Sequence, residues 1–437
     1  MKSECIFSII VKVDKRVILF EKGLTTMTNL FQDSRFRLII FANIASSIGS
    51  GITMIAIPWL LVTSDNGDAV FGYVTLGMTI LSFILTPFVG HLVDQMSRKK
   101  ILLISQMASL IMLLIFSIMG LAGGSYEVWH YMIIYMIGSL YYTFFYPTMF
   151  ALNQEIFSKE QYSSLNGTME IQGQLSSMIA GGVASVLLTK WDLHYILLLD
   201  ACTYAAAIYF YVKLPYKRKT NHEKKRPVSK GAEGIKYLWK RPILFIFLLF
   251  STMPFIGVML TNYLFPVYLT DELNATGSIY AFQSMIYAIG AIVAGAMIPM
   301  IARRVGNEKT IILSVLLYAI VISFIIHVDL PIYLTIMFFI AIGNSGARVA
   351  RNSFLMDRIP NHIIGRVDGV FRSVGLLLRI VLLAIFTEMV SSGLIFYCFI
   401  ILSGLLCVAS LAVFLTWKKG FETDQEETRI TDLLTNK

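Results

Sequence analysis

Twelve long apolar segments constrain this sequence more than any other feature. They are centred near residues 50, 80, 111, 141, 177, 204, 255, 288, 318, 344, 377 and 404. About 20 consecutive apolar residues cross the hydrocarbon core of a bilayer as one helix. Hydrophobic residues make up 56% of the 437 positions and charged residues 14%, which is more apolar than a soluble domain at about 45–50%. The sequence therefore predicts an all-α membrane protein with twelve transmembrane helices.

The distribution of lysine and arginine predicts the orientation of these helices. The stretch from Lys213 to Arg241, after the sixth segment, holds eleven Lys and Arg residues against two acids. The loops after the second and eighth segments and the C-terminal tail are also basic, whereas the loops on the opposite side are poor in Lys and Arg. Since basic loops stay in the cytoplasm, both termini are predicted to be cytoplasmic. The same loops account for the net charge of +9, so no nucleic-acid partner is expected.

These patterns divide the chain into five parts. They are a cytoplasmic N-terminal tail at 1–35, an N-terminal six-helix half at 36–214, a basic cytoplasmic linker at 215–241, a C-terminal six-helix half at 242–418 and a cytoplasmic tail at 419–437. The apolar piece from Ile6 to Val11 is too short to span a bilayer, and Met27 offers an alternative start of translation. Within the linker, Ala232 to Tyr237 is expected to form a short surface helix.

The stretch from Gly90 to Lys100 joins the second apolar segment to the third with the pattern Gly-x-x-x-Asp-x-x-x-Arg-Lys-Lys. Glycine lets helices approach closely, and an aspartate can cap a helix end or pair with a cation. We predict that Gly90, Asp94, Arg98 and Lys99 take part in a cytoplasmic gate. Glu155 ends the fourth segment on the same side and is the predicted partner of the basic loop.

Two sequence matches between the halves predict an internal duplication. Gly295 to Arg304 repeats the pattern of Gly90 to Lys99 after 205 residues, with proline in place of the aspartate. Gln161 to Gly167 matches Ile363 to Gly369 after 202 residues. The similar offsets favour a duplicated six-plus-six architecture, in which a substrate site lies near the membrane midplane between the halves.

The Gly90 to Lys100 pattern resembles the signature loop of the major facilitator superfamily, and the likeness covers about residues 35–418. Within that superfamily, the chain is similar to a drug-efflux branch that includes macrolide exporters and the enterobactin exporter. The narrower likeness is carried by Gly365 to Gly369, Leu165 to Gly167 and Asp200 to Tyr204. The resemblance implies twelve helices in two six-helix halves and export of an amphipathic drug or macrolide-like compound by proton antiport.

One stretch departs from the pattern of that family. Many drug antiporters carry a Gly-Pro pair in the fifth helix, where this chain has Ser177 and Met178 between Gly173 and Gly182. The small residues around them still permit close helix packing. The departure weakens the likeness to a proton-coupled antiporter.

Two carboxylates lie inside predicted membrane segments, where ionised groups are costly and face a cavity or a partner. Glu170 stands in the fifth segment and Asp200 in the sixth. Either could carry a proton, because an apolar surrounding favours the neutral carboxyl, and both are candidates for proton or charge coupling. Pairing at the cytoplasmic interface is the alternative for Glu170, and a structural hydrogen bond to a neighbouring helix is the alternative for Asp200.

The C-terminal half carries four arginines in its membrane segments. Arg348 and Arg351 are one helical turn apart in the tenth segment, and Arg372 and Arg379 are seven apart in the eleventh, so each pair is expected to share a face. Arginine keeps its charge, and its planar fork suits carboxylates. These residues suggest an anionic ligand or pairing with Glu170 or Asp200, while snorkelling to the interface is the alternative for Arg351 and Arg372.

The predicted substrate cavity draws on polar and aromatic residues in several segments. Its candidates are Asn43, Tyr142, Asn262, Arg348 and Arg379. Each of the uncharged ones, taken alone, is more often a helix-packing residue than a ligand contact. No phosphate-binding loop of the Walker type, Ser-His-Asp set or metal-ligand spacing occurs in the sequence, so we expect no enzyme activity, no cofactor and no metal.

The sequence leaves three functions open. A secondary exporter of an amphipathic small molecule is the first, an exporter of an anionic siderophore the second, and a non-transporting sensor or lipid-handling protein the third. The expected partners are a small-molecule substrate, a proton and the lipid bilayer, for a protein that works as a monomer in the plasma membrane of a bacterial cell. Substrate accumulation in cells with and without the protein distinguishes the three.

Overall fold

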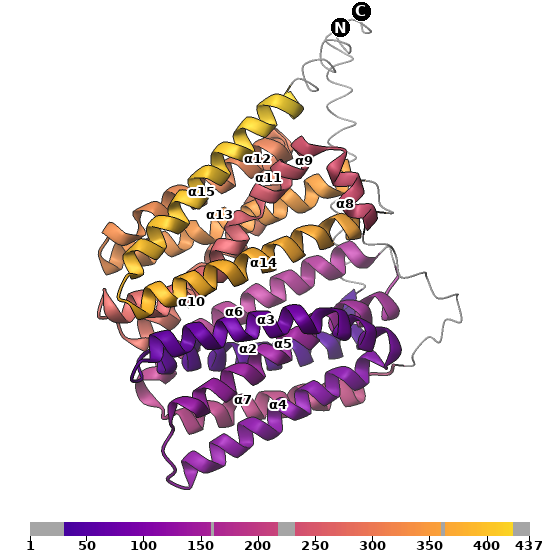
Figure 1. Cartoon of the computed structure of the whole chain (residues 1–437). Coiled ribbons are helices and arrows are strands. Elements are labelled where there is room, and N and C mark those ends of the chain that lie inside the picture. Colours follow the sequence, from indigo (N-terminus) through magenta and orange to yellow (C-terminus); the bar gives the residue numbers. More distant parts are fainter. Residues whose placement is uncertain (1–29, 159–160, 217–231, 360–362, 423–437) are drawn as a thin grey trace, which may run out of the picture.

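The protein is represented by a computed structural model that describes residues 30–158, 161–216, 232–359 and 363–422. The apolar piece from Ile6 to Val11, Met27 and most of the linker lie outside these ranges. Regular structure in the described part of the chain is helical throughout. Figure 1 shows long helices running side by side in two groups, indigo to magenta for the N-terminal half and red to yellow for the C-terminal half.

The N-terminal half consists of six long helices. They are α2 (Ser34–Val62), α3 (Gly67–Gln95), α4 (Arg98–Leu121), α5 (Val128–Ile156), α6 (Tyr162–Lys190) and α7 (Leu193–Lys213). The C-terminal half contains α9 (Pro242–Ser251), α10 (Met253–Asp271), α11 (Gly277–Val305), α12 (Asn307–Phe324), α13 (Leu330–Arg358), α14 (Ile364–Ser391) and α15 (Ile395–Trp417), with short helical turns at Ile325–His327 and Lys418–Glu422.

Each of the twelve predicted segments corresponds to one of these long helical stretches. Two helices, α9 and α10, form a single span from Pro242 to Asp271. The break falls at Thr252 because Pro254 has no N–H to donate to the preceding turn. Within the described ranges, eleven stretches are long and apolar enough to cross a membrane. The remaining long helix, α5, has 29 residues but is rich in tyrosine, which lowers its hydropathy. The predicted twelve-helix fold is confirmed.

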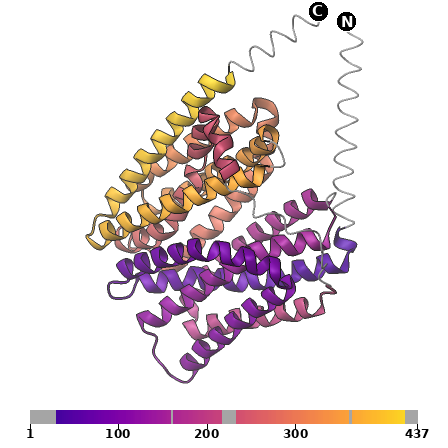
Figure 2. The same ribbon diagram turned by 45° about the vertical axis from the view of Figure 1, so that its right-hand side comes forward.

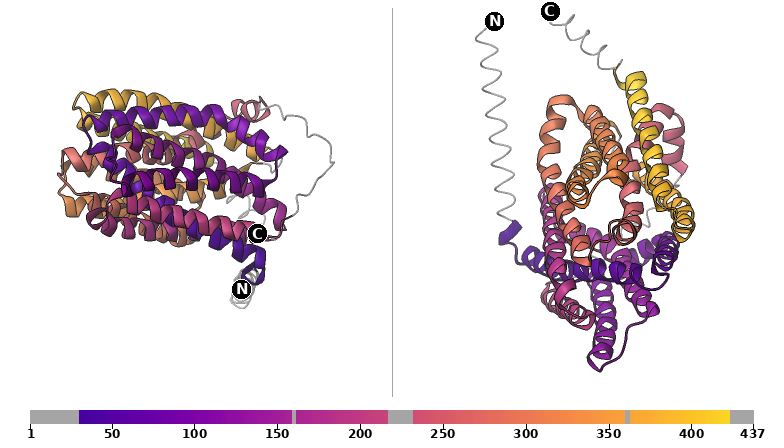
Figure 3. Two further views of the ribbon diagram at one scale, coloured as in Figure 1. Left: turned by 90° about the horizontal axis from the view of Figure 1, so that it is seen from below. Right: turned by 90° about the vertical axis from the view of Figure 1, so that its left-hand side faces the viewer.

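Each half has a hydrophobic core, and the core of the C-terminal half continues into α2 and α3 of the N-terminal half. Phe36, Leu197 and Tyr211 are fully buried among the helices of the N-terminal half. Phe247 and Tyr333 occupy the same kind of position in the C-terminal half. Figures 2 and 3 show the two halves lying one against the other, with the C-terminal half above the N-terminal half in Figure 2. The contact between them runs along α6 with α11 and α3 with α14.

The α6–α11 contact depends on small residues. A Cβ added to Gly181 on α6 would lie 2.7 Å from the backbone nitrogen of Met285 and 3.0 Å from the carbonyl oxygen of Ala281 on α11. No side chain fits at such distances. The packing that the sequence predicts for the small residues of this helix is therefore confirmed at Gly181.

The halves are joined at one end of the bundle, which we call the far end. The hydroxyl of Tyr73 on α3 donates to Glu388 on α14 over 3.0 Å. The indole of Trp59 on α2 stacks on Tyr280 of α11 with ring centroids 5.7 Å apart. A Cβ on Gly72 would meet Thr387 at 2.5 Å. Helices α3 and α14 are therefore in tight contact at this end.

The opposite end, where α2, α4, α6 and α14 begin, is called the linker end. On α3, a Cβ added to Gly90 would meet no described atom within 4 Å, and the same holds for Gly295 on α11. The close helix approach predicted at Gly90 is therefore wrong for this structure. Gly90 stands five residues before the end of α3 and Gly295 ten residues before the end of α11, so both matched stretches lie toward the linker ends of these helices.

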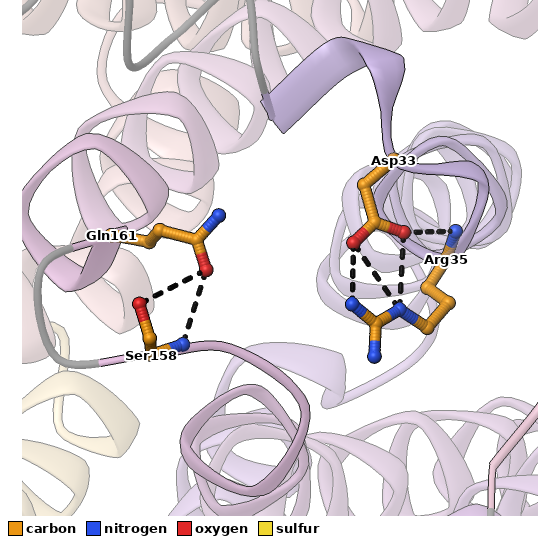
Figure 4. A network of polar contacts seen from close by, with 4 residues as sticks. All are labelled: Asp33, Arg35, Ser158 and Gln161. Atoms are coloured by element: carbon orange, nitrogen blue, oxygen red, sulfur yellow. Dashed lines mark hydrogen bonds and ion pairs between the residues drawn. The ribbon is translucent and has the colours of Figure 1, made fainter.

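Local contacts fix the helix starts at the linker end, as Figure 4 shows. The Asp33 carboxylate accepts hydrogen bonds from the backbone N–H of Arg35 over 2.8 Å and from the guanidinium of the same residue over 2.6 Å. These bonds hold the pKa of Asp33 below its usual value. In the turn before α6, the backbone N–H of Ser158 donates to the side-chain oxygen of Gln161 over 3.1 Å.

The linker contributes one described helix, α8 (Ala232–Trp239), so the predicted short helix from Ala232 to Tyr237 is confirmed. Leu238 is buried and Trp239 is exposed. The helix is therefore amphipathic and lies against the linker end of α14.

Candidate functional site

An ion pair joins the two halves inside the bundle. The guanidinium of Arg348 on α13 lies 2.7 Å from the carboxylate of Glu170 on α6, and the amide of Gln174 also donates to that carboxylate over 3.1 Å. With a rise of about 1.5 Å per residue, the two charged residues lie roughly 12 and 15 Å from the linker ends of their helices. The prediction that a C-terminal arginine pairs with Glu170 is confirmed for Arg348.

The pair is open to the space beside it. The side chain of Glu170 is 55% exposed and that of Arg348 is 36% exposed. The pair thus joins the two halves while part of each side chain stays exposed. A proton or a ligand can therefore reach the carboxylate without unfolding of either half.

Aromatic and amide groups surround the pair. Tyr146 on α5 is close enough to act electrostatically on both Glu170 and Arg348, and its ring stacks on that of Tyr142 at 5.6 Å. On the C-terminal side, the amide of Asn344 donates to the hydroxyl of Tyr287 over 2.7 Å. The predicted cavity residue Tyr142 thus contacts Tyr146, while its hydroxyl shares a hydrogen bond with Ser50 of α2 over 2.8 Å. Apolar rings with a few polar groups are what an amphipathic ligand requires.

Two other arginines of the C-terminal half are occupied by one carboxylate. Asp368 on α14 accepts from Arg372 over 2.7 Å and lies 3.7 Å from Arg351. Arg348 reaches α6 and Arg351 reaches α14, so the two do not point to a common partner. Both arginines pair with Asp368, and snorkelling to the interface stays the alternative prediction for Arg351 and Arg372.

Arg379 is the exception among the four. It lies near the middle of α14, its side chain is half-buried, and its Nε is buried without a hydrogen-bond acceptor. The described part of the chain places no carboxylate within ion-pair distance of it. Its ionisable neighbour is Tyr135 on α5, whose hydroxyl accepts a hydrogen bond from Thr75 on α3 over 3.4 Å.

Asp200 is sealed inside the N-terminal half. Only 2% of its surface is exposed. The hydroxyls of Thr53 and Thr203 donate to its two carboxylate oxygens over 2.6 Å and 3.3 Å. The approach of α7 to α2 needs Gly49, since a Cβ there would lie 2.6 Å from the Asp200 carboxylate. The structure thus shows the hydrogen-bonded arrangement that was the alternative for Asp200, and no arginine reaches it among the described residues.

The predicted gate residues at the linker end form a network within the N-terminal half. Arg98 lies 3.5 Å from Glu155, which confirms their predicted contact. The hydroxyl of Tyr216 donates to the same carboxylate over 2.5 Å, and burial raises the pKa of Tyr216 to about 12, which keeps it a donor.

Lys99 and Asp94 complete the basic loop. The ammonium of Lys99 donates to the carbonyl oxygens of Val212 and Leu214 over 2.9 Å and 2.8 Å. A cation at this place stabilises the C-terminal end of α7. Asp94 is exposed in the last turn of α3. The basic loop therefore ties α4 to α5 and α7.

Two predicted cavity residues lie elsewhere. Asn43 is buried in the core of the N-terminal half, where the hydroxyl of Tyr211 donates to its side-chain oxygen over 2.6 Å. Its assignment to the substrate cavity is wrong for this structure, because its amide is used to hold α2 against α7. Asn262 is exposed on α10 and has no hydrogen bond to a described residue.

Comparison with known proteins adds family information to this geometry. The sequence profile of the Major Facilitator Superfamily matches residues 39–382 and, in a second match, residues 257–431. Macrolide efflux protein A of Streptococcus pyogenes is 24% identical over 368 residues, which cover 81% of this chain and 89% of that protein. The multidrug efflux pump Tap of Mycolicibacterium fortuitum is 21% identical over 355 residues, which cover 77% and 84%.

Solved structures agree in fold. The nucleoside transporter NupG superposes with a TM-score of 0.64 at 18% identity, over 88% of this chain and 99% of that one. A bacterial homologue of the iron transporter ferroportin in an inward-facing state gives a TM-score of 0.66 at 13% identity, over 87% and 98%. These similarities concern the arrangement of helices.

Proposed function

This chain belongs to the Major Facilitator Superfamily and is a multi-pass membrane transporter rather than an enzyme, and on that premise we propose that it exports amphipathic small molecules in exchange for protons. Its macrolide and multidrug efflux relatives support drug efflux in general. The aromatic surroundings of the inter-half pair suit a ligand with a large apolar part.

The observation that carries the proton exchange is the pair of Glu170 and Arg348. The carboxylate of Glu170 binds either the guanidinium or a proton. Protonation removes the negative charge and with it the attraction between the halves at this point. Proton binding therefore changes the relative free energy of the two arrangements of the halves, which is the thermodynamic requirement for coupling. A cationic group of a substrate competes for the same carboxylate.

The proposal includes an orientation. The basic linker and loops favour a plasma membrane of a bacterial cell with the linker end and both termini in the cytoplasm. With this orientation, the open surroundings of Gly90 face the cytoplasm and the Tyr73–Glu388 contact faces outward. The arrangement then takes up substrate from the cytoplasm, as an exporter does, and each chain works as a monomer.

We assign two supporting roles within the N-terminal half. Asp94, Arg98, Lys99 and Glu155 set the position of the linker ends of α3, α4 and α5 and so control the cytoplasmic gate. Asp200 is a second proton-binding carboxyl, because its buried place between hydroxyl donors tolerates both protonation states.

Transport by everted membrane vesicles tests the proposal. Vesicles that contain the protein should accumulate macrolides or lipophilic cationic dyes when respiration acidifies their interior, and should lose them when a proton carrier collapses the gradient. Accumulation that persists without a gradient but requires ATP contradicts proton exchange. Vesicles without the protein, and vesicles with the Glu170→Gln variant, are the controls.

A further inference from the structure

Arg379 stands at a depth where a charge requires compensation. It lies roughly 22 Å from the start and 18 Å from the end of α14, at about 1.5 Å per residue. Arginine cannot become neutral by losing a proton. Its length does not bring it to the interface from this depth, so the compensation comes from a group inside the bundle.

Three carboxylates inside the described part of the bundle have other partners. Glu170 holds Arg348. Asp368 holds Arg351 and Arg372. Asp200 accepts from two threonine hydroxyls. Arg379 therefore retains unused donors, of which the buried Nε–H is one.

A second donor comes from the other half: Tyr135 is hydrogen-bonded to α3, the helix that packs on α14 where Gly72 approaches Thr387. Thr75 gives its proton to the hydroxyl oxygen of Tyr135, which leaves the phenolic proton of Tyr135 to be donated. The ring of Tyr135 is fixed by an edge contact with Phe71 at 5.4 Å. Arg379 and Tyr135 thus offer hydrogen-bond donors from α14 and α5, and the ligand that satisfies both is an acceptor with a negative charge.

The two donor groups lie at one end of an aromatic face. Tyr135, Tyr142 and Tyr146 follow each other on α5 at intervals of seven and four residues, which places all three rings on one side of the helix. Tyr135 and Tyr146 are roughly 16 Å apart along the axis. One elongated molecule can therefore contact Arg379 with an acidic group and lay its apolar part along this face toward Glu170.

We propose that Arg379 and Tyr135 form an anion-binding subsite that recognises a carboxylate or similar acidic group on an amphipathic substrate. The proposal rests on the proposed export function and names a substrate class for it. The acidic group enters as a ligand and undergoes no chemical step. The same geometry gives neutral and cationic amphipaths no contact with Arg379, so these compounds should not depend on it.

Binding measurements on the purified full chain in lipid nanodiscs test the subsite. The probes are a fluorescent amphipathic carboxylic acid and the methyl ester of the same compound, which differ in charge and little in shape. The unmodified protein should bind the acid more tightly than the ester by about tenfold or more. Arg379→Gln should remove this preference while leaving ester binding unchanged, Arg379→Lys should keep part of it, and Tyr135→Phe should reduce it.

Arg372→Gln is the matched control, because it removes an arginine from the same helix that is 79% exposed and already paired. That variant should keep the preference for the acid. An equal preference for acid and ester in the unmodified protein overturns the subsite, as does an unaltered preference in Arg379→Gln. A loss of acid and ester binding together in Arg379→Gln also overturns it, because the residue then supports the fold or the whole cavity.

The outcome is separable from that of the proposed function. Gradient-driven export is scored with the ester, which does not need Arg379. If the ester is not exported by the unmodified protein but the acid preference is present and depends on Arg379, the export proposal fails and the subsite stands. If the ester is exported and the preference is absent, the subsite fails alone.

Discussion

Two arginines of the C-terminal half face the N-terminal half but have different partners there. Arg348 meets Glu170 of α6 at 2.7 Å. Arg379 has a buried Nε without an acceptor, and no carboxylate of the described chain lies within ion-pair distance of it. The side-chain type is the same, so the difference comes from what the opposite half presents. A charge balanced by the other half links the two halves, whereas a charge left unbalanced is available to a ligand.

Charge exchange should produce the largest effect. Glu170→Arg places two guanidinium groups opposite each other and should abolish export. A repulsion of about 2.7 kcal/mol lowers the transport rate about 100-fold, and we expect a loss of at least that size. The double variant Glu170→Arg/Arg348→Glu should restore part of the activity. Uptake of a lipophilic dye by membrane vesicles, normalised to protein content, measures both.

The comparison between the arginines gives this test its control. Glu170→Arg combined with Arg379→Glu should remain inactive, because Arg379 is not the partner of Glu170. Equal rescue by the two second-site changes would mean that the restored net charge matters and the specific pair does not.

Stability should change in opposite directions at the two arginines. Arg379→Met removes a charge that costs about 2.5–3.5 kcal/mol in the membrane interior on insertion scales, so the variant should unfold at a higher temperature in detergent. Arg348→Met breaks a half-exposed pair and should lower stability by about 1 kcal/mol or less. Thermal unfolding of the purified variants without substrate measures both changes. A lower unfolding temperature in Arg379→Met would contradict the conclusion that the charge of Arg379 has no compensating partner.

Much of the fold could be predicted from the sequence, because membrane thickness fixes helix length and the apolar segments report it directly. The Arg98–Glu155 contact was accessible for the same reason, since both residues lie at helix ends on one side. The pairing of Arg351 with Asp368 was not accessible. It depends on the rotation of each helix, and helices that are apolar on all sides carry little information about rotation.

Asn43 and Tyr135 show that the sequence does not say which way a polar side chain in a membrane helix points. Asn43 was expected in the cavity, yet its partner Tyr211 lies 168 residues away in the same half. Tyr135 was not singled out, although its seven-residue spacing from Tyr142 is visible in the sequence. A polar residue in a membrane helix indicates a partner, and the sequence does not say on which side the partner lies.

A change in the packing between α6 and α11, the two helices next to the Glu170–Arg348 pair, should have a moderate effect on stability. Gly181→Ala adds a Cβ at 2.7 Å from the Met285 backbone nitrogen and should cost about 1–3 kcal/mol by overpacking. The displaced α11 should also weaken dye export. Gly173→Ala on the same helix is the control, because its Cβ meets no described atom within 4 Å. Similar unfolding temperatures for the two variants would argue against a tight α6–α11 contact.

The smallest effect on stability is expected at the far end, in the contact between α3 and α14, the helix that carries Arg379. Tyr73→Phe removes the exposed hydrogen bond to Glu388 and should cost about 0.5 kcal/mol, at the lower limit for a hydrogen bond. Tyr397→Phe is a control, since that hydroxyl is exposed on α15 without a described partner. Labels placed on α3 and α14 should report a wider far end only in Tyr73→Phe, and an unchanged distance there would show that the contact does not hold the halves together.

Proton-driven transport by purified protein tests the central claim most directly. Proteoliposomes are loaded with a lipophilic cationic dye and given a pH gradient, and dye movement is compared between the unmodified chain and Glu170→Gln. We predict that the gradient drives dye movement in the unmodified chain, whereas Glu170→Gln retains dye exchange without a gradient and loses the response to one. An undiminished response of Glu170→Gln to the gradient would contradict the role of the Glu170–Arg348 pair in coupling.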